Sequence, residues 1–95
     1  MFIVSLTYVC ELTKVDQFVG EHRDYLDKQY ASGVFLASGR KEPRNGGVIL
    51  ANAESRAKLD VLLEQDPFYQ NGVAKYDVIE FIPSKTCPEL DFLRQ

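Results

Sequence analysis

The sequence predicts one α+β domain with the element order βαββαβ, and three observations lead to that prediction. The chain has 95 residues, which is room for a single domain. Four segments are apolar or alternating in the manner of strands, and two longer segments carry apolar residues at helical spacing. Hydrophobic residues make up 45% of the chain and charged residues 26%, which is the composition of a folded globular protein rather than of a disordered one.

The first part of the chain is expected to form a strand, a helix and a second strand. Residues 2–9 carry apolar side chains in both alternating sets, so this strand should have at least one buried face. The helix is expected to begin at Thr13, whose hydroxyl can accept a hydrogen bond from an amide of the first turn, and to end at Gly33 in a left-handed cap. Residues 34–38 are apolar and partly β-branched, and they form the expected second strand.

A hairpin and a second helix are expected next. The loop over residues 39–47 is rich in glycine, proline and asparagine, and it should join the second strand to a third strand over residues 48–51. Asn52 can cap a helix over residues 53–65. Three leucines form the buried stripe of that helix: Leu59, Leu62 and Leu63.

The last part of the chain begins where the second helix ends. Pro67 stops that helix, because the residue before a proline resists the helical conformation. Residues 73–82 are expected to form a long fourth strand. We therefore expect one domain over residues 1–83, followed by an extended C-terminal tail over residues 84–95.

The order βαββαβ is the split βαβ, or ferredoxin-like, arrangement, a four-stranded antiparallel sheet with both helices on one face. Two helices cover only one face of such a sheet, and the other face usually is polar when it meets water. In the first strand both alternating sets contain apolar residues, and an uncovered apolar face usually marks an interface. We expect a homodimer in which the two uncovered sheet faces meet. The alternative is a monomer with a half-polar open face.

Charge and hydropathy argue against several classes of function. Eleven Lys and Arg stand against fourteen Asp and Glu, and the isoelectric point is near 5.0, so a nucleic-acid partner is not expected. No apolar run reaches the roughly 18–20 residues of a membrane span, so no membrane partner is expected either. The first seven residues have no basic start and no continuous apolar stretch, and we expect a cytoplasmic protein.

Cysteine and histidine are sparse in this chain. Cys10 and Cys87 lie far apart, and neither has a partner at the spacing of a zinc motif. They are expected to be ordinary thiols of a reducing compartment. We expect no metal site and no cofactor.

His22 and Asp66 are the candidate catalytic residues. His22 is the only histidine, and it lies in the apolar stripe of the first helix, so its ring points toward the sheet. A histidine can act as a general base near neutral pH if an acceptor orients its second nitrogen. Asp66 follows Leu63 by three positions, near the buried side of the second helix. The alternatives are that His22 is a core residue and that Asp66 only ends a helix or caps the turn that starts at Pro67.

Ser38 and Arg40 are the candidates for contact with a substrate. Both lie at the end of the second strand, where the hairpin loop opens. The planar guanidinium of Arg40 can bind an anionic group through two parallel hydrogen bonds. The alternative is that Arg40 is an ordinary surface arginine.

Three segments together resemble the YCII-related family of small proteins. They are EHRDYL at residues 21–26, SGVFLASG at residues 32–39 and QDPFYQNGV at residues 65–73. The third segment is the most specific, since it is similar to the family's D-P-F/Y stretch, which a glycine and the last strand follow. The similarity covers residues 1 to about 83.

The resemblance implies a ferredoxin-like fold that dimerises into an α/β barrel, and a His–Asp pair in a pocket, here His22 and Asp66. It also implies kinship with a few relatives that act on aromatic ring-cleavage intermediates as dehydrochlorinases or isomerases. Two hypotheses follow. The protein is a small cofactor-independent lyase or isomerase acting on a small organic substrate, or it is a non-catalytic dimeric module that binds a small molecule or a partner.

Overall fold

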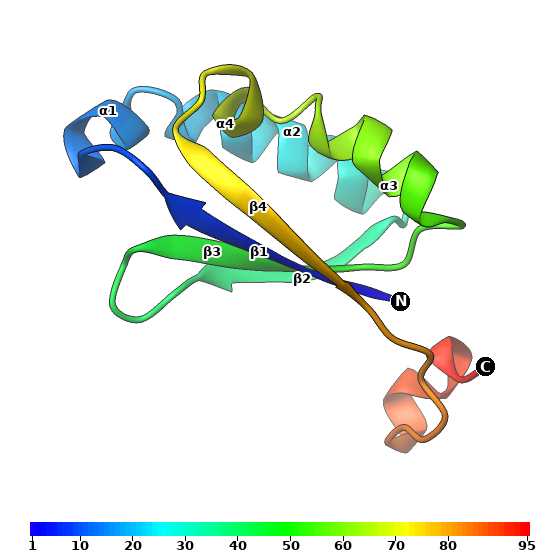
Figure 1. Ribbon diagram of the computed structural model, residues 1–95. Helices are drawn as coiled ribbons and strands as arrows, with labels where there is room; N and C mark the ends of the chain where they lie inside the picture. The colour runs from blue at the N-terminus through cyan, green and yellow to red at the C-terminus, as the bar shows by residue number, and fades with distance from the viewer.

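The computed structural model describes residues 1–95 and has the predicted ferredoxin-like architecture. Its four strands form one antiparallel sheet in the order β2-β3-β1-β4. Figure 1 shows the helices α1, α2, α3 and α4 lying over one face of this sheet. The strands are β1 (Phe2–Tyr8), β2 (Phe35–Arg40), β3 (Gly46–Ala51) and β4 (Ala74–Glu80).

The register of the central strand β1 separates the two faces of the sheet. Val4 of β1 is paired with Ile49 of β3 and Val78 of β4, and this set faces the helices. Ile3, the next residue, belongs to the opposite set and faces away from them. The expectation that the first strand carries apolar residues toward both faces is therefore confirmed.

The first helical segment is two helices, where one helix from Thr13 was predicted. These are α1 (Leu12–Asp16) and α2 (Val19–Ala31). Between them the amides of Gln17 and Phe18 bond to carbonyls three residues earlier, which tightens the turn and redirects the chain. The predicted cap at Thr13 is wrong, since the N-cap is Glu11 and no side chain caps α1.

The end of α2 and the whole of the second helix are set by local caps. Gly33 follows α2 with a φ of 82°, as the sequence predicts. The second helix, α3 (Arg56–Leu63), is shorter than predicted, because Ser55 rather than Asn52 accepts the hydrogen bond of its first turn. A further short helix, α4 (Pro67–Gln70), lies where only a break was expected.

The hairpin loop and the last strand also differ from their predicted bounds. β2 runs on to Arg40 and β3 begins at Gly46, so the loop is shorter than the predicted residues 39–47. β4 ends at Glu80, short of the predicted position 82.

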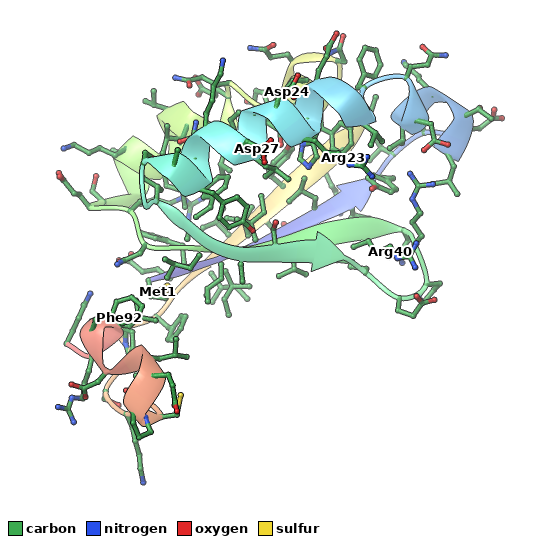
Figure 2. All side chains as sticks on the ribbon, turned by 180° about the vertical axis from the view of Figure 1, so that it is seen from behind. Met1, Arg23, Asp24, Asp27, Arg40 and Phe92 are labelled. Carbon is green, nitrogen blue, oxygen red and sulfur yellow. The ribbon has the colours of Figure 1, made fainter.

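The C-terminal segment is not fully extended. Pro88–Leu93 form a 3₁₀ helix, η1, where an extended tail was predicted. The amide of Gln95 bonds to the carbonyl of Pro83, and the side chain of Leu93 is buried, so the segment folds back on itself. Figure 2 shows η1, with Phe92, beyond the end of the sheet where Met1 lies. No helix of the chain has the length and apolar character that crossing a membrane requires.

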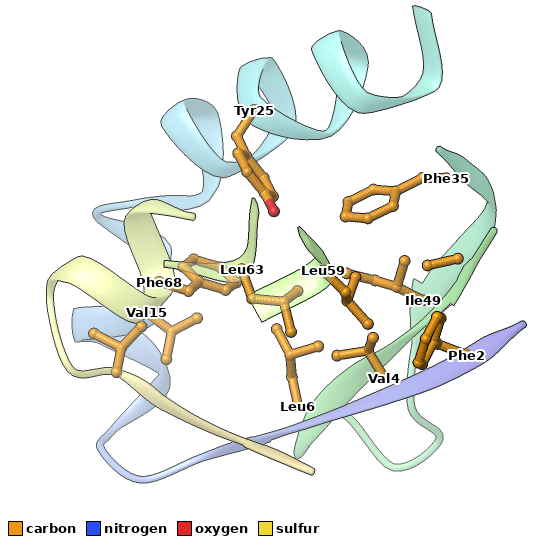
Figure 3. Close-up of a cluster of buried hydrophobic side chains, with 12 residues drawn as sticks. Phe2, Val4, Leu6, Val15, Tyr25, Phe35, Ile49, Leu59, Leu63 and Phe68 are labelled. Carbon is orange, nitrogen blue, oxygen red and sulfur yellow. The ribbon is translucent and has the colours of Figure 1, made fainter. Parts of the chain in front are cut away.

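The core lies between the sheet and the helices, as Figure 3 shows. The buried side chains of the sheet come from β1, β2 and β3, and partly buried residues of β4 pack against them. Burial of this apolar surface is the main force that holds α2, α3 and α4 on the sheet. The buried cluster consists of Phe2, Val4, Leu6, Val15, Tyr25, Phe35, Ile49, Ala51, Leu59, Leu63, Phe68 and Val73.

Candidate functional site

The structure brings His22 and Asp66 together across two elements. His22 lies in the first turn of α2, and Asp66 is the N-cap residue of α4. The distance between Nδ1 of His22 and Oδ1 of Asp66 is 2.7 Å. The contact depends on the helix faces meeting above the sheet, and α2 and α4 do pack against each other.

Asp66 is held by three donors although it is completely buried. Its Oδ1 accepts hydrogen bonds from the ring of His22 and, at 3.0 Å, from the amide of Phe68. Its Oδ2 accepts a hydrogen bond from the hydroxyl of Tyr76 at 2.6 Å. A buried carboxylate is costly unless it is fully hydrogen-bonded, and these contacts meet that requirement. The cap role predicted as the alternative for Asp66 therefore coexists with the contact to His22.

Tyr76 of β4 is the part of this site that the sequence reasoning missed. Burial, and to a smaller extent the charge of Asp66, raise the pKa of Tyr76 far above its usual value, so its hydroxyl stays a donor. Its signal in the sequence is its place in the inward-facing set of β4, between Ala74 and Val78.

Tyr25 of α2 is buried in the core. Its hydroxyl donates to the carbonyl of Leu62 at 2.7 Å. Burial and the charge of Asp66 raise the pKa of Tyr25 as well, so this hydroxyl also remains neutral.

Two contacts fix the ring of His22: its Nδ1 edge faces Asp66, and its face stacks on an aromatic ring. It stacks on the ring of Phe68, with 4.0 Å between centroids and 4° between planes. Since Nδ1 faces the Asp66 carboxylate, the proton of the neutral imidazole is held there and the lone pair is on Nε2. Nε2 makes no hydrogen bond within the protein, and 15% of the side chain is exposed. The arrangement leaves an oriented nitrogen base with access to solvent.

His22 lines a cleft of about 670 Å³ between the helices and the β2–β3 hairpin. Volumes of this order are usual for small-molecule sites. Ser38 and Arg40 line the same cleft, because both belong to the helix-facing set of β2. Ser38 already has a partner, since its Oγ lies 2.6 Å from the hydroxyl of Tyr30. The cleft thus contains three of the four predicted site residues, and Asp66 lies behind His22.

Two further arginines line the cleft, and the sequence reasoning did not select them. Arg23 follows His22 on α2, and Arg44 lies in the hairpin loop. Asp16 of α1 accepts a hydrogen bond from the guanidinium of Arg44 at 2.5 Å. No group of three or more His, Cys, Asp or Glu side chains gathers where it could hold a metal ion.

Comparison with known proteins gives a family and a fold. The model of a family described as the YCII-related domain matches residues 1–82. No curated protein matches the chain. Among the solved structures that match is 5-chloro-2-hydroxyhydroquinone dehydrochlorinase from Burkholderia phenoliruptrix AC1100, in complex with 2,5-dihydroxybenzoquinone. The two chains superpose with a TM-score of 0.75 and 18% sequence identity, over 86% of this chain and 93% of the other. At that identity the similarity shows a shared fold.

Proposed function

The chain belongs to the family of YCII-related domains, and on that premise we propose that it is a cofactor-independent lyase or isomerase whose acid–base pair is His22 and Asp66. The observation that carries the proposal is the 2.7 Å contact between Nδ1 of His22 and the buried Asp66, with Nε2 free in the wall of a cleft. A base, its orienting acceptor and a space for the reacting atom are the parts that proton abstraction requires.

In the proposed reaction, Nε2 of His22 removes a proton from a carbon next to a carbonyl group. The electron pair of the C–H bond forms a C=C bond, and the carbonyl oxygen becomes an enolate oxygen. The imidazolium that results donates its Nδ1–H to Asp66, which lowers its energy. Return of the proton at another position of the enolate gives an isomer, whereas loss of an anionic leaving group with its bonding pair gives an elimination product.

The surroundings of the pair suit this role. Three donors keep the Asp66 carboxylate from moving, and the Phe68 ring supports the imidazole face. A base that is already oriented loses little entropy on reaching the transition state. The matching dehydrochlorinase is named for the removal of hydrogen chloride from its substrate, which is an elimination, one of the two outcomes proposed here.

The second candidate is a non-catalytic module that binds a small molecule. It is favoured by the stack of His22 on Phe68, because a histidine that packs flat against a core aromatic also serves as a structural residue. A non-catalytic binding module would account for the cleft, but it gives no role to the free Nε2 of His22.

We propose a homodimer through the open face of the sheet, and this dimer is compatible with both candidate functions. The outward set contains Ile3 of β1, Val48 and Leu50 of β3, and Ile79 of β4, which are neighbours by register. Val48 and Ile79 are exposed. A second copy placing its own face against this one would bury an apolar surface that is otherwise in water.

The test of the proposed reaction is solvent deuterium exchange at enolisable carbons, followed by proton NMR. Phenylpyruvate is a suitable probe, since its methylene group carries exchangeable C–H bonds next to a carbonyl. We expect the protein to accelerate exchange, and His22→Asn or Asp66→Asn to reduce that acceleration about 10²- to 10⁴-fold. Arg56→Gln, on the surface of α3, is the matched control and should change nothing. Acceleration that survives in His22→Asn contradicts the proposal.

A further inference from the structure

The charged side chains of the cleft are mostly cationic, although the protein is anionic. Arg23, Arg40 and Arg44 come from α2, the end of β2 and the hairpin loop, and they line the cleft with one acid, Asp16. The chain as a whole has a formal net charge of −3. A cleft lined by one sign of charge concentrates ligands of the opposite sign.

The three arginines are not equivalent. Asp16 holds Arg44 in an ion pair, so this arginine is already neutralised. Arg23 and Arg40 take part in none of the ion pairs or side-chain hydrogen bonds of the protein. Figure 2 shows Arg23 on the helix and Arg40 at the end of the neighbouring strand. Two guanidinium groups without a protein partner therefore face one cleft.

Around His22 the wall of the cleft is apolar. Val19 and Leu26 of α2 flank His22, and Phe68 supports its ring. Leu6 and Ile49 contribute from the sheet below. The cleft thus offers an apolar wall for the body of a ligand, an oriented nitrogen base, and two free guanidinium groups.

From this arrangement we propose that the ligand of the cleft is a small organic oxyanion, with a carboxylate or a ring enolate oxygen held by Arg40 and Arg23. A planar guanidinium pairs with a planar oxyanion through two parallel hydrogen bonds, which also fixes the ligand's orientation. The apolar body then lies against Val19, Leu26 and Phe68, within reach of His22. The assignment of the reacting carbon to His22 rests on the proposed function, whereas the anion site itself does not.

The experiment compares ligands that differ in one charge. The full-length protein, labelled with ¹⁵N, is titrated with 4-hydroxybenzoate and with 4-hydroxybenzamide, which have nearly the same shape. We expect the benzoate to shift the backbone amide signals of Gly39, Gly46 and Gly47, which line the cleft. We also expect it to bind at least about tenfold more tightly than the benzamide. 2,5-Dihydroxybenzoquinone, whose oxyanions are on the ring, is the third probe and separates the two sources of the anion.

Arginine variants locate the site. Arg40→Gln and Arg23→Gln should each weaken binding of the preferred anion about 10- to 100-fold, the usual effect of losing a hydrogen bond to a charged group. Arg40→Lys should recover only part of the loss, because an ammonium lacks the planar fork. Arg56→Gln, a similar change on the exposed surface of α3, should bind as the parent does. The dispersion of each variant's spectrum verifies that it is folded.

The outcomes separate this inference from the proposed function. Three outcomes overturn the anion site: measurable and equally tight binding of the benzoate and the benzamide, no binding of either the benzoate or the quinone, or binding of the preferred anion by both arginine variants as tight as by the parent. Anion binding without any accelerated exchange leaves the anion site standing and contradicts the acid–base reaction. Asp66→Asn should lose exchange and keep anion binding, since Asp66 does not line the cleft.

Discussion

The hydroxyl of Tyr76 donates a hydrogen bond to Oδ2 of Asp66 at 2.6 Å, so the last strand of the sheet is tied to the carboxylate that orients His22. The contact joins β4 to the N-terminus of α4, ten residues earlier in the chain. The site therefore depends on the sheet as well as on the two helices.

Tyr76→Phe should destabilise the protein by about 1–3 kcal/mol, because it leaves one oxygen of a buried carboxylate without its donor. Urea unfolding near neutral pH measures the change. Tyr69→Phe is the matched control, since Tyr69 is exposed and its hydroxyl bonds to nothing in the protein. A loss of stability in Tyr69→Phe equal to that in Tyr76→Phe would contradict the importance of the contact to Asp66.

Stability should fall as the pH rises above about 10. Burial raises the pKa values of Tyr25 and Tyr76 in the folded state, whereas in the unfolded chain both titrate near their ordinary value of 10.0. Above that pH the unfolded state binds fewer protons than the folded state, so unfolding becomes more favourable. Urea unfolding between pH 8 and pH 11 should show a shallower decline in Tyr76→Phe than in the parent. Parallel declines would show that Tyr76 does not contribute.

Gly46→Ala should destabilise the protein by about 3 kcal/mol, because an added Cβ would lie 1.8 Å from the carbonyl oxygen of Leu6. Backbone atoms of β1 cannot move away without breaking the pairing with β3. Gly20→Ala, in α2, meets nothing within 4 Å and should instead stabilise the protein by about 1 kcal/mol. Thermal unfolding of both variants checks the opposite signs, and equal effects would refute the steric argument.

Ile79→Asp should convert the expected dimer to a monomer of 10.8 kDa, since the charge would lie within the proposed interface, next to Ile3 of β1. Sedimentation equilibrium at micromolar concentration measures the mass. Val61→Asp on α3 is the control, because Val61 is 56% exposed and Ile79 is 60% exposed, but only Ile79 lies on the open sheet face. A parent protein that sediments as a monomer rules the interface out.

The predicted fold came from periodicity, and periodicity also selected His22 and Asp66, since each is a polar residue in register with an apolar stripe. Periodicity could not reveal the break between α1 and α2. Phe18 follows Val15 at helical spacing, although the chain turns between these two residues. Nor could periodicity find α4, because Pro67 both ends one helix and is well suited to the first turn of another.

The residues that sequence reasoning missed are defined by contacts between distant elements. Tyr76 looks like any inward-facing aromatic until its hydroxyl is seen at Asp66. Arg23 and Arg44 look like surface residues until α2 and the hairpin loop are seen to bound one cleft. Which arginine is neutralised depends on the distance from Asp16, and local sequence does not encode that distance.

One carboxylate, that of Asp66, both caps the four-residue helix α4 and orients the imidazole of His22. Fraying of this single turn would therefore also remove the carboxylate that orients the ring of His22. The amide of Phe68 bonds to the same oxygen, so its hydrogen-exchange rate would report the fraction of molecules in which this turn is formed and the imidazole is aligned. That measurement needs no knowledge of the substrate.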